Sequence, residues 1–312
     1  MSEQTKEKMK EQSFEDEIDL LVLFKEIWKK RIFIFIATAI ISLSSIIYTL
    51  SLTNYYTSES ILNIRDSKDS SMVNNSFGLS SMIGLNLFGE TNSSASEIIE
   101  LIQSREFVKR LIRFEDVLPS LLAIESYDSS SKKLTFDSDV YDSKTKKWVR
   151  NVNQNQPSKP SYLEAHRAYS EMLDVSVDKV SGFISLKFEH VSPIFAQKIL
   201  SLIIGEANNF NREMDIKNTN LALSHFEKEL SKTSLLEMKE SINQLIETQL
   251  ETRMMASIYD DYILVSIEPP FVPDRRSKPS RSFIVIFSTL IGGLMSLLYV
   301  VIRHYFLELK NS

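Results

Sequence analysis

The chain has 312 residues, a formal net charge of −5 and no cysteine. The missing cysteine excludes disulfides, thiolate metal sites and cysteine nucleophiles. The mildly acidic balance predicts no nucleic-acid partner, and four histidines without a paired spacing do not indicate a metal site.

Residues 1–31 are predicted to be a cytoplasmic N-terminal segment that contains an amphipathic helix from Ser13 to Arg31. Ser13 suits an N-cap, and five apolar residues then fall on one stripe. They are Phe14, Ile18, Leu21, Phe24 and Trp28. Such a helix either lies on a membrane surface and leads into a span, or binds a partner.

Two uncharged apolar runs, 32–52 and 283–302, are each long enough to cross a bilayer, which needs ~20 residues. A buried core helix is the alternative, but core helices of this length normally carry polar residues on one side. Lys29, Lys30 and Arg31 precede the first run, which places the N-terminus in the cytoplasm. Two spans would return residues 303–312 there as a short tail.

The charges around the second run conflict with this topology. Four basic residues precede it and two follow it. They are Arg275, Arg276, Lys278 and Arg281 before the run, and Arg303 and Lys310 after it. The first span usually dominates and a long intervening domain weakens the charge rule, so we expect both termini in the cytoplasm and residues 53–282 in the periplasm.

Each run carries a face of small residues, which permits close contact between helices in lipid. These predicted transmembrane packing residues are Thr38, Ser42, Ser45 and Thr49 in the first run, and Ser288, Gly292 and Ser296 in the second. The alternative is that the hydroxyls only bond the backbone of their own helix.

The first half of the segment 53–282 predicts a strand at 55–64, a loop at 67–95 with an apolar island at 77–89, and a helix from Ser94 to about Phe114. Ser94 with Glu97 has the spacing of a capping box. Residues 126–160 are polar but contain Phe136, Tyr141 and Trp148. Such rings either stack on sugars or anchor the loop on its own domain.

A second capping box, Ser161 with Glu164, predicts a helix to about Met172. Strands at 173–177 and 183–188 follow, with a turn near Gly182. In the second strand the apolar residues Ile184, Leu186 and Phe188 alternate with polar ones, as in a half-buried strand.

Ser192-Pro193 predicts the start of a helix of about 40 residues, ~60 Å long, that ends near Lys232. Ser234 with Glu237 would cap a return helix to about Ser257, so that residues 192–257 form a long helical hairpin. Apolar residues at heptad spacing on the first helix predict a seam between copies of the chain, strongest toward its far end. The seam residues are Leu200, Ile203, Ala207, Phe210, Met214 and Leu221.

A last strand at 259–267 leads into a stiff proline connector before the second span. The connector prolines are Pro269, Pro270, Pro273 and Pro279. The chain contains no Walker, GxGxxG or HExxH motif and no Ser-His-Asp spacing, so the sequence predicts neither an enzyme nor a cofactor.

Several short motifs, in this order and between two terminal spans, resemble the Wzz-type chain-length determinants, which are polysaccharide co-polymerases of bacterial envelopes. They begin with Glu17-Ile18-Asp19-Leu20 and Trp28-Lys29, and continue with the stretch 95–107 and Glu189-His190-Val191-Ser192-Pro193. Leu245-Ile-Glu-Thr-Gln249, Glu268-Pro269-Pro-Phe-Val-Pro273 and Lys278-Pro279-Ser280-Arg281 complete the pattern.

The resemblance implies a membrane-anchored α/β (α+β) fold, in which two transmembrane helices flank a periplasmic domain with a mixed sheet at the membrane and a long projecting helical hairpin. It also implies ring-shaped homo-oligomers that work beside a Wzy-type polymerase to set the length of O-antigen or a related glycan. The chain carries no kinase domain, so the resemblance is to the short, kinase-free class in the inner membrane.

Other functions with the same topology remain open. A capsule or exopolysaccharide export subunit, working with an ABC transporter or a separate kinase, has a similar plan. A two-span sensor would need a cytoplasmic output domain, and an enzyme would need a motif that the sequence lacks.

Overall fold

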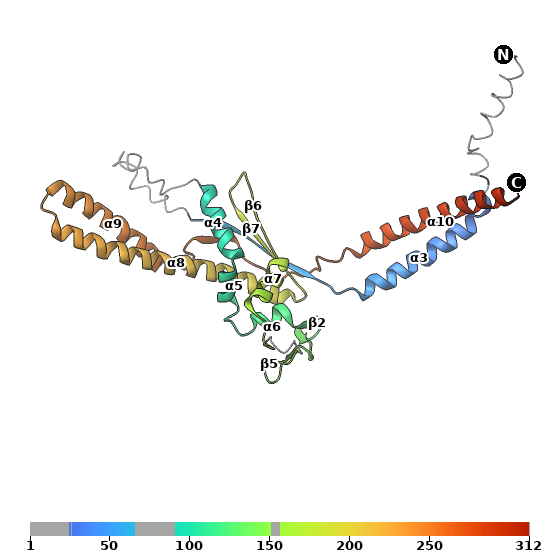
Figure 1. The fold of residues 1–312 in the computed structure, drawn as a ribbon, viewed down its shortest axis with the longest axis horizontal. Helices are drawn as coiled ribbons and strands as arrows, with labels where there is room; N and C mark the ends of the chain where they lie inside the picture. The colour runs from blue at the N-terminus through green and yellow to red at the C-terminus, as the bar shows by residue number, and fades with distance from the viewer. Residues whose placement is uncertain (1–24, 26, 66–90, 151–156, 312) are drawn as a thin grey trace, which may run out of the picture. The chain divides into compact units, whose positions relative to one another are not determined.

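The fold is described from a computed structural model, for residues 25, 27–65, 91–150 and 157–311. These fall into two compact parts, which are described separately. One consists of residues 1–53 and 278–312, and the other of residues 54–277. Figure 1 shows the elements of both parts. The predicted residues Phe14, Ile18, Leu21 and Phe24 and the apolar island at 77–89 lie outside the described residues.

The first part is a pair of antiparallel helices, α3 (Arg31–Ser51) and α10 (Arg281–Asn311). Near one end of the pair the Arg281 guanidinium donates to the Leu52 carbonyl over 3.4 Å. Toward the other end the rings of Phe33 and Tyr299 lie 5.7 Å apart. The two predicted apolar runs are therefore helices that lie side by side (Figure 1). The segment predicted as a tail, 303–312, instead continues α10 as far as Asn311.

The second part is built on a four-stranded sheet in the order β6-β7-β1-β8. Its strands are β1 (Tyr56–Ile64), β6 (Leu173–Val177), β7 (Ile184–His190) and β8 (Leu264–Glu268). Every neighbouring pair is antiparallel, so the expectation of a mixed sheet was wrong. Pairing between β1 and β8 joins residues some 200 positions apart, and no local pattern specifies its direction.

One face of this sheet is buried and the other is polar. Along β7 the side chains of Ile184, Leu186 and Phe188 are fully buried, while the residues between them are half-buried. On the opposite face Lys187 pairs with Glu59 at 3.1 Å. The alternation predicted for a half-buried strand is confirmed.

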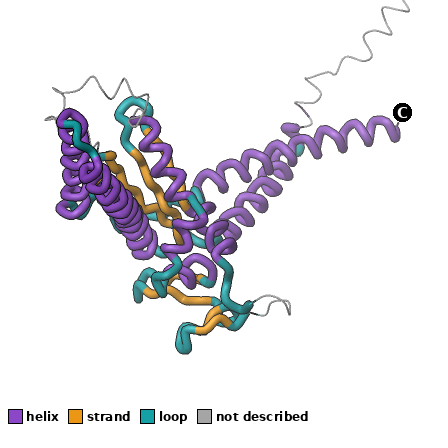
Figure 2. The backbone as a smooth tube through the Cα atoms, turned by 60° about the vertical axis from the view of Figure 1, so that its left-hand side comes forward, coloured by secondary structure: helices purple, strands orange, loops and turns teal. Residues whose placement is uncertain are grey.

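Helices cover the buried face (Figure 2). They are α4 (Thr91–Gln103), α5 (Arg105–Leu111), α6 (Val117–Leu122), α7 (Tyr162–Met172) and the first half of α8 (Pro193–Lys232). Together with the sheet they enclose one apolar core. The second half of α8 pairs with α9 (Leu236–Ile258) to form the predicted helical hairpin.

Helix ends follow the cap chemistry at some positions and not at others. Ser192 accepts from the Phe195 amide over 3.2 Å, and Ser161 with Glu164 forms the predicted capping box. The cap predicted at Ser94 was wrong, because α4 already begins at Thr91. The cap predicted at Ser234 was also wrong, because the chain stays extended to Leu235, which has no side-chain cap bond.

Two small hairpins follow α6. They are β2 (Ile124–Asp128) with β3 (Lys133–Phe136), and β4 (Tyr141–Asp142) with β5 (Lys147–Trp148). Both turns repeat one sequence, Tyr-Asp-Ser-x-Ser/Thr-Lys-Lys, at 127–133 and 141–147. In each turn the aspartate bonds the backbone N–H two residues on and a hydroxyl three residues on, and the first lysine has φ 54°. The repeat therefore encodes one turn geometry twice.

Candidate interaction surfaces

The small-residue faces predicted on the two spans lie between α3 and α10. Ser45, Thr49, Gly292 and Ser296 are buried there, and Thr38, Ser42 and Ser288 are half-buried. Thr289 Oγ1 donates to Ser42 Oγ across the pair over 3.1 Å. Several hydroxyls also donate to carbonyls of their own helix, as Thr38 does to Ile34 over 2.8 Å. Local bonding and close packing thus occur together, because a bonded hydroxyl presents little bulk to the neighbouring helix.

Gly292 is the point of closest approach. A Cβ added there would lie 2.9 Å from Ile41 Cγ2, whereas one added at Gly293 would lie 3.8 Å from Thr38 Oγ1. The sequence analysis did not single out Ile41 or Thr289. Each is adjacent in sequence to a predicted packing residue, Ser42 or Ser288, and only the rotation of the helix pair shows that it faces the partner.

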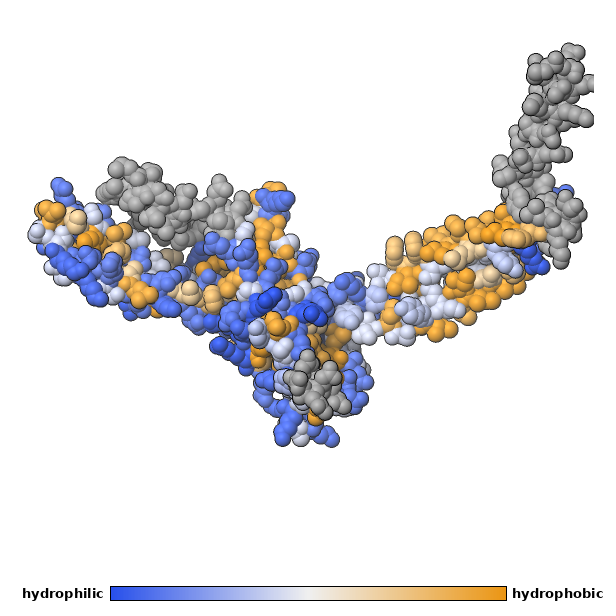
Figure 3. All heavy atoms as spheres, viewed as in Figure 1, coloured by the Kyte–Doolittle hydropathy of each residue, from blue (hydrophilic) through white to orange (hydrophobic). Residues whose placement is uncertain are grey.

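The outer surfaces of the two helices are apolar and open. Within the most apolar window of each, only 6% of α3 and 17% of α10 is buried in the structure. Phe35 is 75% exposed and Leu294 is 68% exposed. Figure 3 shows apolar residues along the outside of both helices. A core helix of a soluble domain would be covered, so these helices have the length, composition and exposure of membrane spans.

Half of the predicted seam between copies belongs to the core instead. Leu200, Ile203 and Ala207 are fully buried against the sheet and the short helices. They cannot also contact a second copy, and their assignment to an intermolecular seam was wrong. A heptad pattern only requires an apolar partner, and here the chain's own core supplies it.

The outer seam positions have a different environment. Phe210 is half-buried beneath the Arg110 guanidinium, 5.4 Å from the ring centre, and Arg110 pairs with Glu206 and Glu213. Further along α8, Met214 is 42% exposed and Leu221 is 61% exposed.

The distal half of the α8–α9 hairpin has a thin interior and an apolar exterior. Thr219, Leu223 and Ile242 are buried between the two helices. Many large apolar side chains remain exposed around them (Figure 3). On α9 and the turn before it they include Leu235, Leu236, Met238, Leu245, Leu250, Met254 and Ile258. An exposed apolar surface of this extent is typical of an interaction site.

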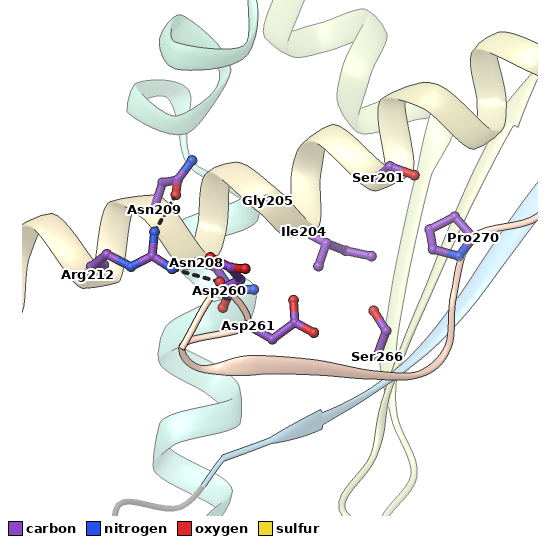
Figure 4. Close-up of a pocket in the computed structure, with 10 residues that line it drawn as sticks. All are labelled: Ser201, Ile204, Gly205, Asn208, Asn209, Arg212, Asp260, Asp261, Ser266 and Pro270. Atoms are coloured by element: carbon purple, nitrogen blue, oxygen red, sulfur yellow. Dashed lines mark hydrogen bonds between the residues drawn. The ribbon is translucent and has the colours of Figure 1, made fainter. Parts of the chain in front are cut away.

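A polar depression of about 370 Å³ lies at the base of the hairpin, where α9 returns into β8 (Figure 4). Its lining is Ser201, Ile204, Gly205, Asn208, Asn209, Arg212, Asp260, Asp261, Ser266 and Pro270.

The polar groups of this depression are largely bound to the chain itself. Asn208 accepts from the Ile263 and Leu264 amides and donates to the Leu264 carbonyl, at 2.7–3.0 Å. Arg212 donates to the carbonyls of Tyr259 and Asp260, both at 2.7 Å. The depression therefore works as a bracket that fixes the entry into β8.

Tyr262, beside this bracket, donates to Asp215 Oδ2 over 2.7 Å. Burial, together with the aspartate, raises the pKa of the Tyr262 hydroxyl above its ordinary value. The tyrosine stays protonated and adds a tie between the last strand and α8.

The proline connector runs along β1. The buried hydroxyls of Ser58 and Ser60 donate to the carbonyls of Phe271 and Glu268, each over 2.7 Å. The Ser277 amide donates to the Tyr55 carbonyl over 2.8 Å. Of the predicted connector residues, Pro269 is exposed, Pro270 and Pro279 are half-buried and Pro273 is buried.

The aromatic residues of the 126–160 segment pack on one another. The buried Tyr141 ring lies 5.6 Å from Phe136 and 5.1 Å from Trp148. Trp148 in turn packs against the main core. The rings anchor their own hairpins, and of the two interpretations this is the one that the geometry supports.

His190 joins three elements at the base of the domain. Its Nδ1 accepts from the Ser192 amide over 3.0 Å, so its Nε2 carries the proton and donates to the Ser120 carbonyl over 2.9 Å. Burial lowers the pKa of the His190 ring, although both backbone contacts oppose the shift. Among the described residues no group of three His, Asp or Glu side chains could hold a metal ion.

Comparison with known proteins gives one family match. Residues 16–114 match the model of the Wzz family, the chain length determinant proteins. The resemblance recognised from the sequence motifs is thereby confirmed over this stretch. No curated protein matches the sequence.

Two solved structures are similar to the chain. A full-length bacterial polysaccharide co-polymerase has 11% identity and a TM-score of 0.39, with 94% of this chain and 99% of that chain covered. A fragment of WzzB, a polysaccharide co-polymerase from Salmonella Typhimurium, has 14% identity and a TM-score of 0.30, with 72% of this chain and 100% of that chain covered.

Proposed function

We propose that this chain is a Wzz-family polysaccharide co-polymerase that regulates the chain length of a surface glycan without catalysing polymerisation. The observation that carries the proposal is the Wzz match over residues 16–114. The order of elements supports it, because two apolar helices flank one α+β domain with a long helical hairpin. The glycan we propose is lipopolysaccharide O-antigen or a related surface polysaccharide.

The deciding experiment compares cells with and without this gene on a sugar-ladder gel. A modal band pattern that disappears on deletion and returns on complementation supports chain-length control. A loss of exported polymer, with the lengths of the remaining chains unchanged, would favour the alternative of a capsule or exopolysaccharide export subunit.

We place the chain in the bacterial inner membrane, with both termini in the cytoplasm and residues 53–282 in the periplasm. The antiparallel pairing of α3 and α10 supports this, since it brings both chain ends to the same end of the helix pair. Reporter fusions test it. A cytoplasm-active reporter that is silent at the C-terminus, or a periplasm-active one that is silent near residue 150, would contradict this topology.

We infer that the chain acts as a homo-oligomeric ring beside a Wzy-type polymerase and the growing glycan. The exposed side chains of Met214 and Leu221 support a contact between copies on the outer hairpin. Replacing both with Asp should weaken the oligomer and shorten or randomise the glycan, because buried carboxylates are costly. The matched control is Asn218→Asp with Ser224→Asp, at exposed polar positions of the same helix. An unchanged oligomer and unchanged modal length in the first variant would show that this surface is not the contact.

A further inference from the structure

Arg275 and Arg276 stand on the side of the second span where cations are disfavoured. Both are exposed, and they lie in the connector a few residues before α10. In the proposed topology this is the periplasmic side, whereas residues near spans normally place their positive charge on the cytoplasmic side. Two arginines in this position therefore need a physical reason of their own.

The chain itself keeps these arginines close to the membrane. The Ser277 amide bonds the Tyr55 carbonyl over 2.8 Å, so both connections of the 54–277 domain meet at one point. Tyr55 follows the last residue of α3, Ser51, by four positions, and Ser277 precedes the first residue of α10 by four. Four extended residues span at most about 14 Å. Whatever the orientation of the domain, this point stays within about that distance of both helix ends.

A second pair of cations is carried by the β2–β3 hairpin. The hairpin is held to the start of β1 by Tyr127, whose ring meets that of Tyr56 edge-on at 6.4 Å. Its tip presents Lys132 and Lys133, both exposed. Asp128, the carboxylate in the same turn, is occupied by the Ser130 amide and the Ser131 hydroxyl.

The two pairs form a basic rim, which we define as Lys132, Lys133, Arg275 and Arg276. Within the described part of the chain none of the four makes an ion pair. Asp128 and Asp274 are the carboxylates next to them in sequence, so the rim retains a positive excess.

We propose that the basic rim binds the phosphate headgroups of anionic phospholipids and seats the membrane-proximal end of the domain on the bilayer. The partner is the lipid surface itself, because the two connections hold the rim beside it and the charges are complementary. The proposal depends on α3 and α10 spanning a membrane, and not on the control of glycan length. Failure of either proposal therefore leaves the other standing.

The absence of cysteine allows a direct test on the full-length protein. Ser129→Cys, at the exposed hairpin tip, takes a single donor fluorophore. The labelled protein is reconstituted in nanodiscs that carry an acceptor on a lipid headgroup. One set contains phosphatidylcholine alone, and the other also contains phosphatidylglycerol. We expect stronger energy transfer in the anionic discs, and a loss of the difference at high salt, where screening is short-ranged.

Changing all four rim residues to Gln should abolish the preference for anionic discs. Each cation near an anionic surface contributes about fivefold to the equilibrium between seated and lifted states. The matched control changes four exposed cations of the helical hairpin to Gln. They are Lys217, Lys228, Lys239 and Arg253.

Three outcomes would overturn the proposal. They are equal energy transfer in neutral and anionic discs, a preference for anionic discs that high salt does not reduce, and an equal loss in the control variant. The salt titration uses the unaltered rim, so it decides the matter even where the quadruple variant fails to fold.

Discussion

Replacing Gly292 with alanine should loosen the pair of apolar helices, while the same change at Gly293 should not. The two glycines are adjacent on α10, so they share helix propensity and depth in the proposed bilayer. They differ in what an added methyl group would meet. The comparison therefore isolates packing from the general cost of changing a glycine.

The expected size of the effect follows from three distances. A Cβ at position 292 would lie 2.9 Å from Ile41 Cγ2, 3.0 Å from its Cδ1 and 3.1 Å from its Cβ. The last atom is fixed to the backbone, so rotation of the Ile41 side chain cannot relieve the contact fully. Overpacking of this kind costs about 1–3 kcal/mol, which lowers the close-packed population about five- to a hundredfold. At Gly293 the nearest atom is 3.8 Å away, an ordinary contact.

A disulfide can report this population, because the chain has no cysteine of its own. The hydroxyls of Ser42 and Thr289 lie 3.1 Å apart across the pair, so cysteines at these positions come within reach of a bond. We expect Gly292→Ala to slow oxidation of this cysteine pair at least about fivefold and Gly293→Ala to change it less than twofold. Trimming Ile41 to alanine in the Gly292→Ala background should restore the rate, as coupling between contacting residues requires.

Equal rates for the two alanine variants would refute the reasoning. So would a slow rate that the Ile41 change leaves untouched, because the defect would then lie in α10 alone. Either result would leave the small face of α10 as a property of one helix and not of the pair.

Three further predictions concern the 54–277 domain. Asn208→Ala should lower the free energy of unfolding by at least about 2 kcal/mol, because it leaves buried backbone groups of β8, including Leu264, unpaired, whereas Asn209→Ala should cost less than half as much in the same denaturant titration. Ser58→Ala should raise amide exchange in the connector, since its hydroxyl ties the connector to β1, and unchanged exchange would argue against that tie. The folded-state pKa of His190 is lowered, so its contribution to stability is present above its ordinary pKa of 6.5 and is lost as the pH falls through the folded value; a His190→Asn variant with the same acid dependence as the parent would contradict this.

Local cap chemistry predicted the helix boundaries well where the side chain competes with nothing else. Ser192-Pro193 starts α8 at the predicted residue, because the serine accepts from Phe195 and the proline needs no donor at the first turn. The same spacing failed at Ser234, where the extended turn carries the chain past the serine to Leu235. A break at Ser104 was missed, although this serine accepts from the Phe107 amide in the same way.

Heptad spacing gave the right helix and the wrong partner for half of its residues. Leu200 and Ala207 repeat every seven residues with Met214 and Leu221, yet the first two are in the core and the last two are exposed. The pattern encodes only the face of the helix that is apolar. Where along its length the domain ends depends on the sheet, whose strands come from three distant parts of the chain.

Proline chemistry explains why the connector is held by side chains and not by a regular ladder. Prolines at 269, 270 and 273 offer no N–H, so a strand in this position could not donate to its neighbour. The carbonyls remain, and Ser58 and Ser60 of β1 supply the donors that they need. Two hydroxyls that are fully buried at the edge of the core would be costly without these acceptors.

The route of the connector also explains how one short segment can serve both ends of the domain's chain. Thr57 donates to the Ser277 hydroxyl over 2.8 Å, and the Ser277 amide bonds Tyr55, so the segment after the first span and the segment before the second are tied side by side. A displacement of β1 must therefore carry the start of the second connection with it. The serines that make this possible have no motif of their own. They look like ordinary polar residues on an alternating strand, and only the pairing of β1 with a segment more than 200 residues away gives them this role.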